Sequence, residues 1–131
     1  MDIIRMIHRF LGETLLLIAL VGVILAIIGL IRKQALERAE RIFGLIYAGL
    51  LDIQALLGLI TLIYLVMMAG TSILTSMFIL HPVLMILAVV VVHASRGRRS
   101  GPMPSRHWAQ LVAYGLSLLL VFVGRMLFVM M

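Results

Sequence analysis

Four long apolar stretches constrain this chain more than any other feature of its sequence. They cover residues 10–31, 42–68, 71–94 and 108–131. Each has about 20 residues or more, which is the length that an α-helix needs to cross the hydrocarbon core of a bilayer. Backbone amides in a bilayer find no water to bond, so such stretches form helices rather than open strands. The sequence therefore predicts four transmembrane helices, at about 3–31, 42–68, 71–95 and 106–130.

The composition favours a membrane protein and excludes several other classes. Of the 131 residues, 64% are hydrophobic and only 12% are charged, and the mean hydropathy is +1.24. A soluble chain of this length could not bury so much apolar side chain. The net charge is +6, but the basic residues lie in short clusters between apolar stretches, so nucleic acid is not an expected partner. The chain has no cysteine, which excludes disulfides, iron–sulfur clusters and c-type haem attachment.

The basic clusters predict the orientation of the helices. Eight of the eleven Lys and Arg residues lie in segments 32–41 and 95–106. Basic loops stay in the cytoplasm, so both termini and the short turn at Gly70 are expected outside. Short connections make neighbouring helices antiparallel. We therefore expect residues 1–131 to form a single all-α domain. This domain would be an up-down bundle that crosses the plasma (inner) membrane of a prokaryote several times.

The few polar residues inside the apolar stretches are the candidates for function, because each is costly at membrane depth. They are His8, Glu13, Asp52, Gln54, His81, His93 and Arg125. His81 is the most informative, since it lies well inside its helix and Pro82 follows it. A proline frees the backbone carbonyl one turn earlier. One interpretation of His81 is a neutral side chain bonded to a carbonyl or hydroxyl. The other is a metal or haem ligand.

A second haem ligand is available at the start of the first helix. His8 is expected at the same outer level as His81, and Gly12 follows one turn later on the same helix face, which leaves room for a flat macrocycle. Arg5, Arg9 and Arg125 lie at this level as well, where they could pair with haem propionates. Without a haem, these arginines would be ordinary interface anchors. The pattern predicts one haem b whose iron is held axially by the two histidines.

Other polar residues suggest weaker possibilities. His93 and His107 could form a second pair on the cytoplasmic side. However, His81 and His93 are twelve residues apart, about 120° around a helix, so a second, inner haem is not expected. Asp52 lies on a different helix face from Gln54 and has no evident partner in the sequence.

A stripe on the second predicted helix should face the bundle interior. Tyr47, Gln54, Gly58 and Thr61 fall on one face of this helix. In a haem-binding bundle, Gln54 and Gly58 would lie beside the cofactor. The alternative interpretation is that the stripe supplies hydrogen bonds between helices.

Three motifs resemble one four-helix half of the haem A synthase family. The segment His8-Arg9-Phe10-Leu11-Gly12 matches the H-R-x-x-G motif of such a half, and residues 54–61 match its Q-x-x-L-G-x-x-T helix. His81 stands for the histidine of the next helix. The resemblance implies that His8 and His81 bind one haem near the outer surface, with Arg9 close to a propionate. Arg5 replaces the glutamate of the catalytic half, and the cysteine pair and second half are missing. The resemblance therefore implies haem binding without oxidation of a haem methyl group.

We expect a small membrane b-type cytochrome, an electron carrier or structural haem subunit rather than a stand-alone enzyme. Its partners would be the lipid bilayer and either a redox partner or other subunits of a respiratory or photosynthetic membrane complex. One alternative is a haem-free accessory scaffold subunit. Another is a small four-helix proton-coupled transporter that uses Glu13, although this residue can instead pair with Arg9 one turn earlier.

Overall fold

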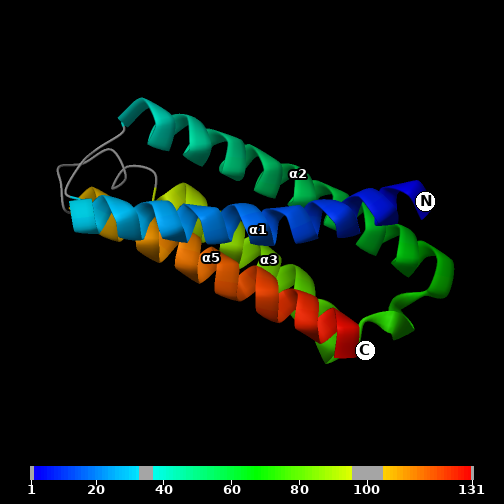
Figure 1. Cartoon of the computed structure of the whole chain (residues 1–131). Coiled ribbons are helices and arrows are strands. Elements are labelled where there is room, and N and C mark those ends of the chain that lie inside the picture. The colour runs from blue at the N-terminus through cyan, green and yellow to red at the C-terminus, as the bar shows by residue number, and fades with distance from the viewer. Residues whose placement is uncertain (1, 33–36, 96–104, 131) are drawn as a thin grey trace.

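The computed structural model describes residues 2–32, 37–95 and 105–130, which form four α-helices and one short 3₁₀-helix (Figure 1). In chain order the elements are α1 (Asp2–Arg32), α2 (Glu37–Ala69), η1 (Thr71–Ile73), α3 (Ser76–Ala94) and α5 (Ser105–Met130). The segments long and apolar enough to cross a membrane are α1, Arg38–Ala69 of α2 and His107–Leu127 of α5. The apolar part of α3, Phe78–Ala94, is shorter. The predicted all-helical architecture is confirmed.

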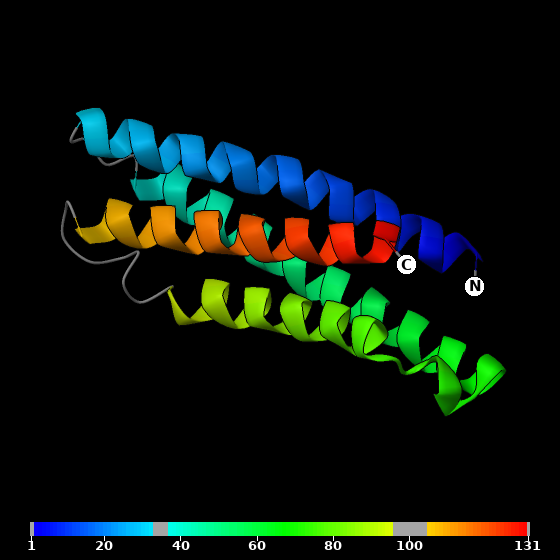
Figure 2. The same cartoon turned by 90° about the horizontal axis from the view of Figure 1, so that it is seen from below.

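Successive helices run in opposite directions, and both termini lie at the same end of the bundle as the connection between α2 and α3 (Figure 1). α5 packs against α1 and α3, and α2 also packs against α1 and α3. Figure 2 shows α5 between α1 and α3, with α2 behind them. The helices therefore close into a ring in the order α1, α5, α3, α2. In this ring, α1 and α3 are diagonal neighbours.

The third helix begins at Ser76 instead of residue 71, because the chain needs room to turn after α2. Gly70 adopts φ of +79°, a left-handed conformation that glycine takes without steric cost. Its amide still donates to the carbonyl of Val66 at 2.8 Å, which closes the end of α2. The 3₁₀ turn and the extended residue Thr75 follow before α3 starts. With 19 residues, α3 is about 28 Å long.

The inward face of α1 consists mostly of small residues. Its buried positions are Leu15, Ala19, Gly22, Ala26 and Gly29. Their spacing alternates between four and three residues, the repeat of helices that pack side by side over a long distance. Rings from α5 fill the space that the glycines leave. A Cβ added at Gly22 would lie 2.7 Å from the Tyr114 ring, and one added at Gly29 would lie 2.5 Å from the His107 ring. α1 therefore offers a nearly bare backbone to large side chains of its neighbour.

The outward faces of the four helices carry large apolar side chains that are exposed. Examples are Phe10 on α1, Leu56 on α2, Val90 on α3 and Leu119 on α5. A water-soluble domain rarely exposes apolar surface of this extent on every side. The surface is compatible with contact to a lipid bilayer.

Candidate functional site

The rings of His8 and His81 meet across the bundle, although α1 and α3 are diagonal neighbours. Their ring centres are 6.4 Å apart and their planes are nearly perpendicular, at 86°. A metal–imidazole bond is about 2.0 Å long and each nitrogen lies about 1.1 Å from its ring centre, so two imidazoles on opposite sides of one metal ion have centres about 6.2 Å apart. The observed separation of 6.4 Å is close to this value, and it also lies within the range of about 4.5–7 Å of edge-to-face ring contacts.

The orientation of the His81 ring is set by α5. Its Nδ1 lies 2.9 Å from the backbone carbonyl oxygen of Gly124 and donates its proton to it. Metal-binding histidines commonly use one nitrogen in this way, which fixes the tautomer and the orientation of the ring. Gly124 permits the close approach, since a Cβ there would lie 3.3 Å from His81 Nδ1 and 2.5 Å from the Met85 methyl carbon.

A glycine of α2 also lies against the ring of His8, and a glycine of α1 lies against Gln54. A Cβ at Gly58 would lie 2.9 Å from His8 Cε1, and one at Gly12 would lie 2.9 Å from Gln54 Nε2. The structure thus brings together both predicted ligands and the three neighbours predicted from the motifs of α1 and α2. Among the described residues, His8 Nδ1 and Gln54 Oε1 are buried and have no hydrogen-bond partner. Gln54 is thus the polar side chain that lies beside the His8 ring.

The three predicted propionate-binding arginines do not form one cluster. Arg9 and Arg125 both approach Glu13, at 3.9 and 3.0 Å, whereas the Arg5 guanidinium lies 5.8 Å from the ring centre of Tyr64. Glu13 therefore joins α1 to α5 through Arg125, and its predicted pairing with Arg9 is confirmed. All these ion-paired side chains are at least partly exposed, so each pair contributes little to stability.

The other two histidines each face a carboxylate of α2. His93 Nε2 lies 2.9 and 3.1 Å from the two carboxylate oxygens of Asp52. His107 is only 1% exposed, and its Nδ1 lies 3.7 Å from Glu40 Oε1. Gln110 Nε2 donates to the other oxygen of Glu40 at 3.1 Å. These contacts hold α2 against α3 and α5.

Sequence reasoning missed the Asp52–His93 pair. The two residues are 41 positions apart, and each lies on a helix face that the motifs left unexplained. The available signal was that both are ionisable residues within apolar stretches on neighbouring antiparallel helices, and that such groups usually pair with one another.

The polar stripe of α2 faces inward at its first two positions. Tyr47 is fully buried, and its hydroxyl is 2.7 Å from the Ser117 hydroxyl of α5. Ser117 also donates to the carbonyl of Tyr114 in its own helix. Gln54 is buried beside Gly12, while the partly buried Thr61 donates to a carbonyl within α2. The stripe thus holds α2 to α5 through Tyr47 and supplies the surroundings of His8 through Gln54.

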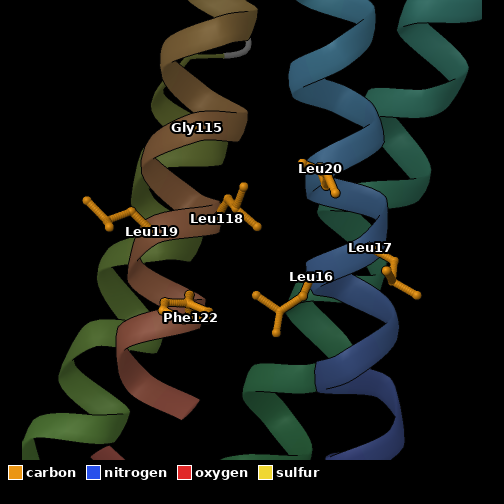
Figure 3. Close-up of a pocket in the computed structure, with 7 residues that line it drawn as sticks. All are labelled: Leu16, Leu17, Leu20, Gly115, Leu118, Leu119 and Phe122. Atoms are coloured by element: carbon orange, nitrogen blue, oxygen red, sulfur yellow. The ribbon is translucent and has the colours of Figure 1, made fainter. Parts of the chain in front are cut away.

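A groove of about 480 Å³ runs between α1 and α5 (Figure 3). Figure 3 shows Leu16 of α1 and Leu118 of α5 pointing toward one another across it. Only leucine, glycine and phenylalanine line the groove, so it offers no side chain for chemistry. The groove does not include the histidine pair.

No family model matches this chain, and neither a curated protein nor a solved structure does. Across residues 2–32, 37–95 and 105–130, no group of three or more His, Asp or Glu side chains is arranged to hold a metal ion. An axial haem site requires only two protein ligands, because the macrocycle provides the remaining four.

Proposed function

We propose that the protein is a small membrane cytochrome that holds one haem b between His8 and His81. The observation that carries the proposal is the 6.4 Å separation of the two ring centres, together with the hydrogen bond from His81 Nδ1 to Gly124. The first matches two ligands of one iron, and the second fixes the tautomer that such a ligand needs.

The surroundings of the two rings fit a flat cofactor. Gly58 and Gly124 bring backbone, and no side chain, against His8 and His81. A bound haem would supply one-electron redox chemistry. His8 and His81 would hold it, and the apolar helices would exclude water.

We further propose that the bundle spans the plasma membrane of a prokaryote with both termini outside. The distribution of Lys and Arg supports this orientation, because the connections between α1 and α2 and between α3 and α5 are the basic ones. The histidine pair would then lie near the outer face. Arg9 and Arg125, which both approach Glu13, would lie at the same level and are the candidates to bind propionates, whereas Arg5 lies over the Tyr64 ring. This arrangement agrees with the resemblance to one half of a haem A synthase and suits an electron carrier or a structural haem subunit of a larger complex.

The test is a reduced-minus-oxidised absorption spectrum of the purified protein and of three variants. We expect the band of a reduced b-type haem in the parent protein and its loss in His8→Ala and His81→Ala. His93→Ala is the matched control, since His93 lies twelve residues from His81 on the same helix and pairs with Asp52. It should keep the band. A featureless spectrum of protein isolated with its native partners would refute the cytochrome proposal.

The second candidate is a haem-free scaffold subunit. The apolar outer surface and the groove between α1 and α5 favour it, because both suit contact with lipids or other membrane helices. The featureless spectrum described above, with the helices still folded, is the outcome expected of this candidate. Transport through Glu13 has less support, since Arg125 and Arg9 engage its carboxylate.

A further inference from the structure

Gln54 of α2 places a polar side chain against α1 beside His8. The residue is buried, with only 7% of its surface exposed, and a Cβ at Gly12 would lie 2.9 Å from its Nε2. Gly12 and His8 are one turn apart on the same face of α1. The nitrogen end of the Gln54 amide therefore lies at the α1 backbone, within one helical turn of His8.

Both oxygen atoms of Gln54, the side-chain oxygen and the backbone carbonyl, lie near the His8 ring. The carbonyl belongs to the helix ladder of α2, in which it accepts from the amide four positions later. The side-chain Oε1 and His8 Nδ1 are both buried, and neither has a partner elsewhere in residues 2–32, 37–95 and 105–130. An imidazole N–H is a donor and an amide oxygen is an acceptor. A bond between the two would satisfy both atoms, and a buried polar atom left unpaired costs free energy.

The second histidine of the pair has an acceptor of a similar kind. His81 Nδ1 lies 2.9 Å from the backbone carbonyl oxygen of Gly124 in α5. Histidines that ligate a metal usually donate their other N–H to a carbonyl, a carboxylate or water, which fixes the tautomer and the orientation of the ring. The backbone of α5 supplies this acceptor for His81. For His8 the acceptor at hand is a side chain, which a substitution can remove.

We propose that Gln54 is the positioning residue of His8. Its side-chain oxygen accepts a hydrogen bond from His8 Nδ1, so that the ring keeps one tautomer and one orientation and its other nitrogen is left to bind iron. This inference rests on the proposed function, because a fixed tautomer matters for a histidine that is a ligand. The hydrogen bond itself requires no haem, and it can therefore be measured in the protein without haem.

The test is the tautomer of His8 in the haem-free, full-length protein, measured by nitrogen NMR of histidine-labelled protein in lipid nanodiscs. At alkaline pH each imidazole is neutral and carries one proton, and protonated and unprotonated ring nitrogens give separate signals. The signals of His8 are identified by their loss in His8→Gln. We expect a single tautomer, with the proton on Nδ1, in the parent protein. Gln54→Leu should give a mixture with the tautomer that carries the proton on Nε2.

Two further variants separate the hydrogen bond from general packing. Gln110→Leu makes the same change at a second buried glutamine, whose Nε2 donates to Glu40 at 3.1 Å, and should leave His8 as in the parent. Gln54→Glu keeps an acceptor oxygen in either protonation state and should keep the proton on Nδ1.

Two outcomes would overturn the inference. One is a parent protein in which His8 carries its proton on Nε2. The other is an unchanged single tautomer in Gln54→Leu. The first outcome is read from the parent protein alone, so the inference stays testable should Gln54→Leu fail to fold.

Haem titration of the same variants separates this inference from the proposed function. Gln54→Leu should bind haem about 10- to 100-fold more weakly than the parent, as for loss of other partners of ligating histidines, and Gln110→Leu should bind equally well. Haem binding by the parent, with the tautomer and the affinity unchanged in Gln54→Leu, would refute the inference and leave the cytochrome. A tautomer change in Gln54→Leu without haem binding by the parent would refute the cytochrome and leave the hydrogen bond.

Discussion

Replacing Gly58 by alanine tests whether this glycine makes room for the ring of His8. The added carbon would lie 2.9 Å from His8 Cε1. Two carbon atoms in favourable contact are about 3.5–4.0 Å apart, so the ring or the helix must move by about 0.6–1.1 Å. Metal–ligand bonds tolerate deviations of only about 0.2 Å. We therefore expect haem affinity to fall by about 10- to 100-fold, as for other changes beside a ligand.

The matched control is Gly49→Ala, which makes the same change on the same helix. A Cβ at Gly49 meets no atom within 4 Å, so this variant should bind haem like the parent protein. Haem is titrated into each apoprotein and followed by absorbance, and circular dichroism checks that the helices are retained.

Thermal unfolding of the apoproteins gives a readout that does not depend on haem. Overpacking should lower the stability of Gly58→Ala by about 1–3 kcal/mol. Gly49→Ala should be neutral or more stable by up to about 1 kcal/mol, because alanine is the better helix former. Equal haem affinity and equal stability of the two variants would refute the argument that Gly58 is required by the His8 ring.

Three further predictions concern the fold and its orientation. Tyr47→Phe removes a buried hydroxyl that is hydrogen-bonded to Ser117 at 2.7 Å, so the free energy of unfolding should fall by about 0.6–1.5 kcal/mol. An unchanged midpoint of thermal unfolding would mean that this hydrogen bond contributes nothing to stability. Gly22→Ala places a carbon 2.7 Å from the Tyr114 ring of α5 and should lower the free energy of unfolding by about 1–3 kcal/mol. Unchanged stability would show that α1 and α5 can move apart at this position without cost. Because the chain lacks cysteine, variants with a single cysteine report the orientation of the helices. An impermeant maleimide should label Ser72→Cys in intact cells and Ser95→Cys only after permeabilisation. The opposite pattern would overturn the proposed topology.

The helices themselves could be predicted from the sequence, because length and hydropathy decide where they form. The beginning of α3 could not. Residues 71–75 are as compatible with a helix as with a turn, and the choice depends on the positive φ of Gly70 and on the distance that the chain must span between α2 and α3. Propensity carries no information on that distance.

The central part of the candidate site followed from helix periodicity. His8, Gly12, Gln54 and Gly58 lie on inward faces, and the structure places them beside one another. The contacts of charged residues at the periphery were harder to predict. Arg125 of α5 reaches Glu13 on the neighbouring helix α1. The rotation and tilt of the helices decide which of several long side chains meet, and a single sequence does not specify them.

The seam between α1 and α5 has a consequence for the order of assembly. α1 is synthesised first and α5 after the other three helices, yet Gly22 and Gly29 of α1 are filled only by Tyr114 and His107 of α5. The acceptor that orients His81 also belongs to α5. Until α5 inserts, the histidine pair is therefore incomplete, and any cofactor that it holds is captured by the closed bundle rather than by the growing chain. In the proposed cytochrome, haem loading would therefore be a late step in biogenesis.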